Sequence, residues 1–237
     1  MKRKIGNVKR IRFVEIDSTN AYAKTLRSRG ENVVVTARRQ TGGMGTKGRS
    51  FSSNEGGVYL TKLVFYEAFP AKDAFKVMAS AAVAVCRTLE KYGILPCIKW
   101  ANDVYVSDKK ISGILIENVF SGSEISSSLI GIGLNVFNEL PDELDGIATT
   151  MARETGKRFS VEEVTETLIA ELEKEVEISA YQSRIGYMGE RAILLFPDGE
   201  KEGKLLLVDE RGGLHVEIEG EVLTLTAAEV SLRLKKE

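Results

Sequence analysis

The chain has 237 residues, of which 43% are apolar and 28% are charged, an ordinary globular composition that excludes a disordered or collagen-like protein. This length provides for one large core with a small appendage, but not for two full-sized catalytic domains. The 33 basic residues nearly balance the 34 acidic ones, which argues against a surface for non-specific nucleic-acid binding. No apolar run approaches the roughly 20 residues of a membrane span and no signal peptide is evident, so we expect a cytoplasmic protein.

The first predicted elements are a strand, a capped helix and a loop. Residues Ile11 to Ile16 favour a strand, and Asp17-Ser18-Thr19-Asn20 offers N-cap side chains for an apolar-periodic helix that ends near Gly30. The β-branched run Val33 to Val35 predicts a short strand. The stretch from Arg38 to Ser50 contains four glycines and several basic residues without periodicity, which predicts a loop.

The middle of the chain predicts a mixed or antiparallel sheet with packed helices. Val58 to Phe65 is typical of a strand, and Asp73 to Tyr92, rich in alanine with apolar residues at helical spacing, is typical of a buried helix. Four further strands follow in succession, at Ile98 to Trp100, Val104 to Val106, Ile111 to Glu117 and Leu129 to Leu134. The predicted fold class is therefore α+β.

The predicted secondary structure changes near residue 189 from helix to short strands, which indicates two domains. Ser160 and Glu163 form a capping-box pattern at the head of a helix that runs to about Tyr181. From Arg191 onward we expect five short strands with glycine-containing turns between them. We therefore expect a main domain at residues 1–188 and a small β-barrel at residues 189–237 that docks on it.

Histidine and cysteine usage excludes several kinds of catalytic site. The only histidine, His215, falls on the polar face of a predicted strand and is expected to be solvated. Most Ser-His-Asp and Cys-His mechanisms are thereby excluded. Cys86 and Cys97 have no further cysteine or histidine at metal-ligand spacing, so we expect buried free thiols rather than a zinc site or a disulfide.

The predicted loop combines the parts of an anion-binding site. Between Gln40 and Arg49 it offers backbone N–H groups, glycines that permit close approach, and cationic side chains. Its spacing matches neither the GxxxxGK[ST] phosphate loop nor the GxGxxG dinucleotide fingerprint. On this pattern alone, a mobile surface loop is an equally good interpretation.

Three further segments carry candidate site residues, and two of them predict a slot between strands. Lys99-Trp100-Ala101-Asn102-Asp103 joins the only tryptophan to a lysine, an amide and a carboxylate, although an Asn-Asp turn also accounts for it. Lys110 stands at the mouth of a strand that contains Gly113, and Gly131-Ile132-Gly133-Leu134-Asn135 places two glycines on one face of another strand. Glycine inside a strand often marks close approach by a ligand, and two such strands favour a slot.

Six ordered motifs resemble those of the biotin–protein ligases, also called biotin–[carboxylase carrier] ligases. The motifs are Asp17 to Asn20, Gln40 to Arg49, Lys99 to Asp103, Lys110 to Glu117, Gly131 to Asn135, and Glu229-Val230-Ser231-Leu232-Arg233. The resemblance covers most of the chain. It implies the class II synthetase-like catalytic fold of biotin/lipoate ligases and a small C-terminal SH3-like β-barrel.

The resemblance implies a two-step, ATP-dependent ligation. The biotin carboxylate attacks the α-phosphate of ATP to give biotinyl-5′-adenylate and pyrophosphate, and a lysine of a biotin carboxyl carrier domain then attacks the activated carbonyl and releases AMP. Neither step needs a nucleophile on the enzyme, so positioning and charge stabilisation suffice without a triad. The resemblance further implies the carrier domain of a biotin-dependent carboxylase as partner and a homodimer, and Mg²⁺ is expected with the ATP phosphates, its ligands being unknown.

Individual roles also follow from the resemblance. It implies that Lys110 contacts the biotin carboxylate and α-phosphate, that Arg49 reaches the phosphates, and that Asp103 orients the incoming lysine. The implied biotin-binding residues are Ser18, Thr19, Asn20, Gln40, Gly43, Lys110, Gly113, Leu115, Gly131 and Gly133. The implied ATP-binding residues are Gly45, Lys47, Arg49, Phe51, Asn102, Asn135 and Arg233.

The chain departs from the family pattern at a few positions. Met44 and Thr46 stand where the family usually has two arginines, Ala101 replaces a proline, and Phe51 replaces a tryptophan but retains an aromatic ring that can stack on adenine. The loss of two guanidinium groups predicts weaker retention of the adenylate, for which Lys47 and Arg49 compensate only in part.

Other interpretations stay open. A lipoate–protein ligase or octanoyltransferase shares the catalytic fold, and a degenerate protein would retain biotin without ligating it. Some family members carry an N-terminal DNA-binding domain, but about ten residues before the first strand are too few for one. The basic residues there, expected to be a solvated flank, are Lys2, Arg3, Lys4, Lys9, Arg10 and Arg12. We therefore expect a monofunctional ligase that binds neither nucleic acid nor membrane.

Overall fold

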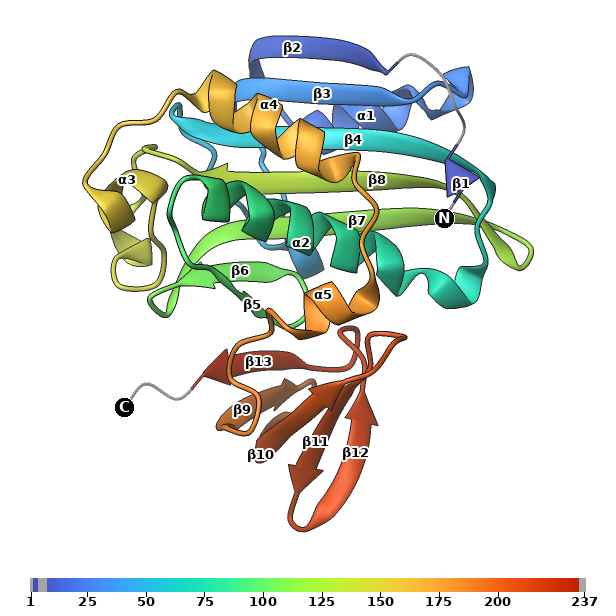
Figure 1. The fold of residues 1–237 in the computed structure, drawn as a ribbon, viewed down its shortest axis with the longest axis vertical. Helices are drawn as coiled ribbons and strands as arrows, with labels where there is room; N and C mark the ends of the chain where they lie inside the picture. Colours follow the sequence, from blue (N-terminus) through green and yellow to red (C-terminus); the bar gives the residue numbers. More distant parts are fainter. Residues whose placement is uncertain (1, 4–7, 235–237) are drawn as a thin grey trace.

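The computed structural model describes residues 2–3 and 8–234, which form an eight-stranded sheet with helices and a separate five-stranded sheet (Figure 1). We call them the large sheet and the small sheet. Figure 1 shows the small sheet beyond the β5 edge of the large one, next to α5 (Ile178–Gln182). Lys4 of the basic N-terminal run lies outside the described residues.

The large sheet is mixed, as predicted. Its order is β2-β3-β4-β8-β7-β6-β5, with β1 paired to β4. Only the β2–β3 pair is parallel among the ladders of the described residues. The strands are β1 (Lys2–Arg3), β2 (Lys9–Ile16), β3 (Val33–Gln40), β4 (Gly57–Ala68), β5 (Cys97–Lys99), β6 (Asp103–Val106), β7 (Lys109–Ser121) and β8 (Glu124–Asn135).

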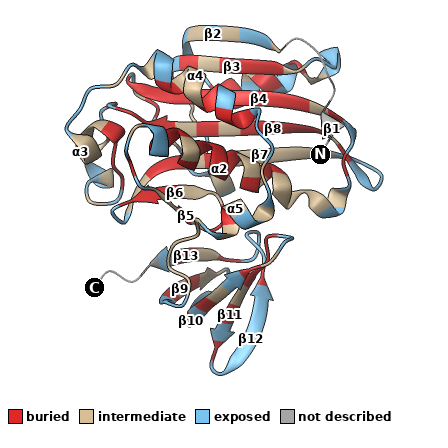
Figure 2. Ribbon diagram, in the orientation of Figure 1, coloured by how far each residue is buried: buried red, intermediate tan, exposed pale blue. Residues whose placement is uncertain are grey.

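The helices lie on opposite faces of the large sheet. α2 (Phe75–Lys91) and α4 (Val161–Leu172) pack over the face in front in Figure 1, and the main apolar core is buried beneath them (Figure 2). α1 (Thr19–Thr25) packs on β3, β4 and β8 over a smaller cluster that includes Leu63 and Leu129. Side chains alternate along each strand. Strand residues that lie between those of the main core therefore face the α1 side of the sheet. The remaining helical segments are α3 (Met151–Thr155) and the 3₁₀ turns Arg27–Arg29, Thr46–Gly48, Ala71–Asp73 and Asp142–Leu144.

The first two predicted helices form, but two other boundaries were wrong. The strand β3 continues to Gln40, so the predicted loop does not begin at Arg38; pairing with β2 extends the strand, since Arg39 lies opposite Glu15. The helix expected from Ser160 to Tyr181 divides into α4 and α5. Several glutamates follow one another near the end of α4, where the helix dipole disfavours negative charge. The short α3 was not predicted.

The small sheet is antiparallel, in the order β12-β11-β10-β9-β13. Five strands in this region were predicted, but within the described residues no ladder joins β12 to β13, so a closed barrel is not formed. The strands are β9 (Arg191–Phe196), β10 (Gly199–Val208), β11 (Leu214–Ile218), β12 (Glu221–Leu225) and β13 (Ser231–Leu234).

Several side chains have more partners than the sequence indicated. His215 is only 28% exposed and its Nε2 lies 3.1 Å from Asp209 Oδ2, so the prediction of a solvated histidine was wrong. The turn between β10 and β11 brings the Asp209 carboxylate next to the imidazole ring of His215. Arg10 and Arg12 are exposed as expected, yet they pair with glutamates of α4. Cys86 is buried and Cys97 is half-buried, both as free thiols.

None of the helices in the described part of the chain has the length and apolar character required to cross a membrane.

Candidate active site

The floor of the candidate site is a patch of glycines on two neighbouring strands. Gly113 of β7 lies directly opposite Gly133 of β8, and Leu115 lies opposite Gly131. A Cβ at Gly133 would stand only 2.4 Å from the ring of Phe51, and a Cβ at Gly131 would stand 3.3 Å from Asn20 Nδ2. A side chain at Gly133 is therefore excluded by Phe51, and at Gly113, Gly131 and Gly133 the floor is bare backbone in a slot on the α1 side of the sheet.

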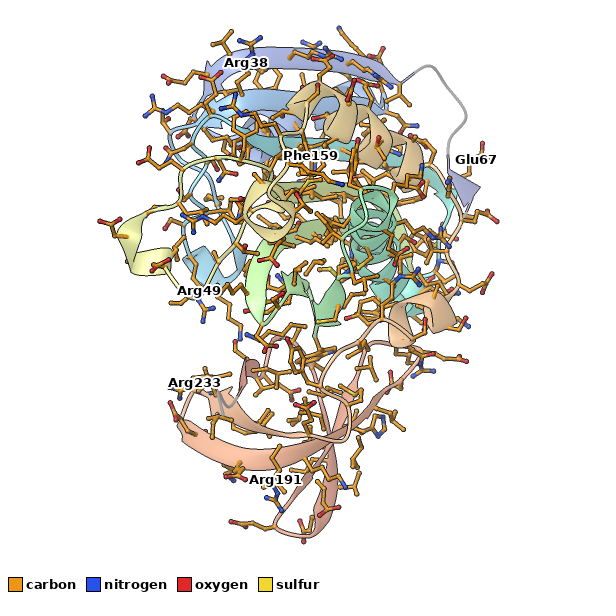
Figure 3. All side chains as sticks on the ribbon, turned by 60° about the vertical axis from the view of Figure 1, so that its left-hand side comes forward. Arg38, Arg49, Glu67, Phe159, Arg191 and Arg233 are labelled. Carbon is orange, nitrogen blue, oxygen red and sulfur yellow. The ribbon has the colours of Figure 1, made fainter. Side chains whose placement is uncertain are left out.

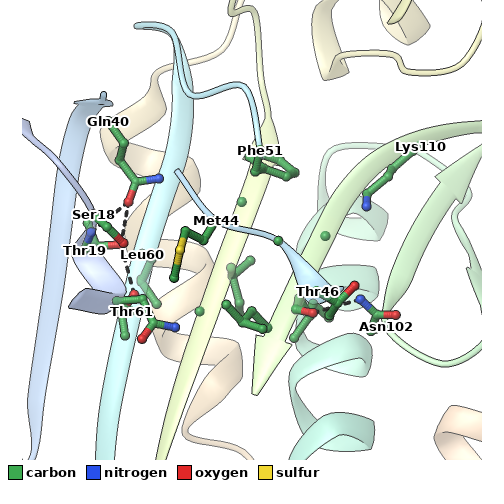
Figure 4. Close-up of a pocket in the computed structure, with 18 residues that line it drawn as sticks. Ser18, Thr19, Gln40, Met44, Thr46, Phe51, Leu60, Thr61, Asn102 and Lys110 are labelled. Carbon is green, nitrogen blue, oxygen red and sulfur yellow. Dashed lines mark hydrogen bonds between the residues drawn. The ribbon is translucent and has the colours of Figure 1, made fainter. Parts of the chain in front are cut away.

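One end of the slot is polar and held rigidly by hydrogen bonds (Figure 4). Ser18 caps α1 by accepting a hydrogen bond from the Ala21 amide. Thr19 donates to Gln40 Oε1 from its backbone N at 2.8 Å and from its hydroxyl at 2.9 Å. Its hydroxyl also lies 2.9 Å from that of Thr61. The helix N-terminus and two strands thus fix these groups before any ligand arrives.

Asn20 adds an unsatisfied donor to this end. Its side chain is only 6% exposed, and its Nδ2 has no hydrogen-bond partner among the described residues. A buried amide left unpaired costs roughly 1–3 kcal/mol. Since Asn20 lines the cavity, a ligand with a carbonyl or similar acceptor would relieve this cost.

The other end of the slot carries charge. Lys110 Nζ lies 2.6 Å from Asp103 Oδ1, and both side chains are partly exposed. Asn102 Nδ2 donates to the backbone oxygen of Ile114 at 3.0 Å, which ties the start of β6 to β7. Burial lowers the pKa of Lys99, and the positive charges of Lys110 and Arg49 lower it further, against the opposing effect of Asp103. Several cations thus gather around one carboxylate, an arrangement suited to an anionic ligand.

The roof of the slot comes from the segment between β3 and β4. Met44 and Thr46 line the cavity together with Phe51, whose ring lies over Gly133 and 5.9 Å from Lys110 Nζ (Figure 4). The remaining cavity is about 50 Å³. Small-molecule sites generally measure ~300–1,000 Å³, so this roof must open to admit a ligand of ordinary size.

Most of the predicted biotin-binding and ATP-binding residues come together here. They share a place in the floor, the roof or one of the two ends of a single cavity. The predicted residues that line it are Ser18, Thr19, Asn20, Gln40, Gly45, Phe51, Asn102, Lys110, Gly113, Leu115, Gly131 and Gly133. Asp103 is adjacent through its ion pair with Lys110.

Besides Asp103, five predicted residues lie outside the cavity lining. Gly43 instead packs against Ser53 and the Phe51 backbone. Lys47 Nζ bonds Ser231 Oγ at 3.0 Å and the Val230 carbonyl at 3.4 Å. Asn135 is buried and donates to the Thr149 carbonyl. Arg49 and Arg233 are exposed side chains, the second paired with Glu200 (Figure 3).

Sequence reasoning missed part of the lining. Leu60, Thr61, Ile114 and Ile132 all contribute to it, and Thr61 joins the polar network directly. A hydroxyl directly after the apolar run from Val58 to Leu60 was a signal for Thr61. Leu60, Ile114 and Ile132 belong to the main apolar core, so the strand pattern identifies them as core residues and gives no sign that they also border a cavity.

Comparison with known proteins points to one family. Residues 12–135 match the model of the biotin/lipoate A/B protein ligase family. The bifunctional ligase/repressor BirA of Bacillus subtilis is 33% identical over 165 residues, an alignment that covers 67% of this chain but only about half (51%) of that protein. The corresponding protein of Bacillus spizizenii is 30% identical over 236 residues, covering 92% of this chain and 72% of that protein.

A solved structure agrees with these relatives. The biotin protein ligase from Aquifex aeolicus in complex with biotin and ATP superposes with a TM-score of 0.78 at 31% identity, covering 96% of this chain and 99% of that one. The similarity thus extends over both sheets and over the slot. The chain belongs to the biotin/lipoate A/B protein ligase family.

Proposed function

We propose that this chain is an ATP-dependent biotin–[acetyl-CoA-carboxylase] ligase, which joins biotin to a lysine of a biotin carboxyl carrier domain through biotinyl-5′-adenylate. The observation that carries the proposal is the polarity of the slot. It has a preorganised polar end with the unsatisfied amide of Asn20, a bare glycine floor, and Lys110 with Asp103 at the far end. The similar Aquifex aeolicus structure, a complex with biotin and ATP, supports it.

The polar end suits the ureido group of biotin. The Asn20 amide and the Ser18 hydroxyl can donate to the urea oxygen, and the Thr19–Gln40 network holds the surrounding groups in place. The flat bicycle then rests on Gly131 and Gly133, where no Cβ intervenes. Buried polar groups of the ligand would be paired, which is what makes such a site selective.

In the first step, Lys110 stabilises the negative charge of the reacting carboxylate and phosphate. The carboxylate at the end of the biotin side chain is directed toward Lys110, which exchanges its contact with Asp103 for the carboxylate and the α-phosphate. An ammonium group can follow negative charge from the attacking oxygen to the pentacoordinate phosphorus and its oxygens. Pyrophosphate leaves with the bonding electron pair, and biotinyl-5′-adenylate remains in the slot.

In the second step, Asp103 receives the amine of the carrier lysine. Its carboxylate attracts the ammonium form and favours the geometry for attack on the mixed anhydride. The ammonium first gives one proton to Asp103 or solvent, and the neutral nitrogen then attacks the carbonyl carbon of the anhydride. A second proton passes from nitrogen to solvent as the amide forms, and the bond from the carbonyl carbon to the phosphate oxygen breaks, so that AMP leaves with the electron pair. Asn102 and Phe51 border the space on the nucleotide side of the slot. Arg49 and the backbone of Gly45 belong to the roof and would approach the phosphates when it closes over them.

Magnesium enters this proposal only with the nucleotide. Within the described residues no group of three or more histidine, cysteine, aspartate or glutamate side chains could hold a metal ion. The described side chains therefore offer no such ligand set for a resident metal. We propose that Mg²⁺ arrives bound to the ATP phosphates.

The wider assignments are also proposals. They comprise a catalytic domain at residues 1–188 and an SH3-like domain at residues 189–237, a cytoplasmic location, a homodimer, and no binding of nucleic acid or membrane. The two domains are supported by the separation into two sheets and by the similarity over both, and the absence of nucleic-acid binding is supported by the near-neutral charge. The cytoplasmic location and the homodimer rest on the sequence expectation and the family resemblance. Size-exclusion chromatography with light scattering tests the homodimer, which a monomeric mass at micromolar concentration would refute.

The direct test of function offers the protein a choice of substrates. ATP is supplied with radiolabelled biotin or lipoate, and adenylate formation and transfer to a carrier domain are measured separately. We expect adenylate from biotin and transfer to the carrier. Adenylate from lipoate alone would identify a lipoate ligase, and tight biotin binding without adenylation would identify a degenerate binding protein.

A further inference from the structure

The segment that precedes Asp103 is clamped from two sides. The indole Nε1 of Trp100 donates a buried hydrogen bond of 3.0 Å to the carbonyl of Gly212. The hydroxyl of Tyr181 donates another buried hydrogen bond, of 2.8 Å, to the carbonyl of Ala101. Trp100 and Ala101 are both nearly inaccessible to solvent. Neither residue lines the slot, yet both are fixed by groups far away in the sequence.

Gly212 belongs to a rigid turn of the small sheet between β10 and β11. Asp209 Oδ1 accepts hydrogen bonds from the amides of Arg211 and Gly213, at 2.8 and 2.9 Å. Gly212 has a φ of +84°, and a Cβ there would stand 2.2 Å from the ring of Phe75 on α2. Only glycine therefore allows the turn to lie against α2 and present its carbonyl to Trp100.

The clamp connects to the charged end of the slot within three residues. Asn102 follows Ala101 and is bonded to Ile114 of β7 through both its backbone and its side chain. Asp103 comes next and holds Lys110 at 2.6 Å. Residues 100–103 form a short segment in which each residue is held by a hydrogen bond or an ion pair. A displacement of Trp100 would therefore also displace Asp103.

We infer that the Asp209–Gly213 turn of the small sheet is a positioning element for the Asp103–Lys110 pair, and that Trp100 is the positioning residue through which it acts. The inference rests on the proposed function, because it states how the small sheet contributes to the transfer step. The turn keeps Asp103 where the carrier lysine must arrive. The polar end of the slot, built from α1 and β3, does not depend on it.

A second contact between the same two parts of the molecule provides a matched control. Gln182 Nε2 of α5 donates to the carbonyl of Val208 on β10 at 2.7 Å. This hydrogen bond also joins the small sheet to the helices, but no residue of the 100–103 segment takes part in it. Trp100→Phe and Gln182→Leu each remove one donor from one carbonyl of the small sheet. Trp100→Phe also leaves a cavity in the core and should destabilise the protein more, so the stability of both variants is measured and the activities are compared at a temperature where both are folded.

The experiment compares these variants of the full chain in two ways. Single-turnover assays measure adenylate formation from ATP and biotin, and transfer from preformed adenylate to a carrier domain. Independently of activity, acetylation by sulfo-N-hydroxysuccinimide acetate, mapped by mass spectrometry, measures how freely Lys110 reacts. Lys24, which pairs with Glu117 far from the clamp, is the internal reference. Asp209→Asn loosens the turn without altering Trp100 and should act in the same direction.

We expect Trp100→Phe to slow transfer by roughly tenfold to a hundredfold, since a small misplacement of a reacting group costs about this much, and to slow adenylate formation as well, because Lys110 acts in that step. Lys110 should be acetylated several times faster in Trp100→Phe, and unchanged in Gln182→Leu. Transfer and acetylation equal to those of the unaltered chain, or to those of Gln182→Leu, would overturn the inference. If the unaltered chain forms no adenylate from biotin, the proposed function fails, and the acetylation comparison alone still decides whether the turn positions Lys110.

Discussion

The replacement Thr46→Arg should slow the escape of biotinyl-adenylate. Thr46 and Met44 line the roof of the slot, at the positions where the family pattern usually has arginine. Among the described residues lining the cavity, Lys110 is the one cation, and it is paired with Asp103. Lys47, which was expected to compensate in part, is bonded to Ser231 and Val230 instead. The roof therefore offers the adenylate phosphate few charged contacts.

The size of the effect follows from two opposing contributions. A hydrogen bond from a guanidinium to the phosphate contributes about 1.5–3 kcal/mol. Ordering a long arginine side chain offsets part of this, up to ~2 kcal/mol at full burial and less in an exposed roof. The expected net gain is about 1–2 kcal/mol, which corresponds to a release rate slower by roughly fivefold to thirtyfold.

Stopped-flow release of biotinyl-adenylate and the labelling of a bystander protein measure this together. Adenylate that escapes acylates stray lysines, so the unaltered chain should label a bystander detectably and Thr46→Arg should do so less. Thr46→Met is the control, because it adds length without charge and should leave the release rate nearly unchanged. Equal release rates for the unaltered chain and Thr46→Arg would show that backbone amides or Arg49 already hold the phosphate, and would refute the reasoning.

Three other predictions concern the slot and the stability of the fold. Lys110→Ala should fold normally and slow adenylation by roughly tenfold to a hundredfold, as measured by pyrophosphate release; unchanged kinetics would remove Lys110 from the site. Residues 38–50 should gain protection from hydrogen exchange when biotinyl-adenylate binds, because the roof must open and then close over the ligand, and equal protection in both states would make it a static wall. Burial by itself raises the pKa of the Glu171 carboxyl, but hydrogen bonds from Lys174 and Lys91 outweigh burial and hold that pKa below its ordinary value. The stabilisation is therefore complete above the ordinary glutamate pKa and is lost as the pH falls through the lower folded-state pKa, so Tm should fall over this acidic range more steeply for the unaltered chain than for Glu171→Gln.

Local pattern determined much of this protein. Apolar spacing predicted the long helix α2, and Ser18 and Ser160 cap α1 and α4 as their sequence context indicated. The glycines and Lys110 were recognisable as parts of a slot because glycine inside a strand and a cation at its mouth are unusual locally. Such signals work because helix caps and strand alternation depend on residues within a few positions of one another.

Other features were decided by contacts between distant residues. The register of β7 and β8 set Gly113 opposite Gly133, and Thr61 reached the polar network from a strand 42 residues beyond Thr19. Lys47 turned away to Ser231, 184 residues along the chain. Only tertiary structure could decide these pairings, because a side chain's partner depends on strand register and on how sheets pack, whereas its own sequence neighbourhood states only that it is polar, small or charged.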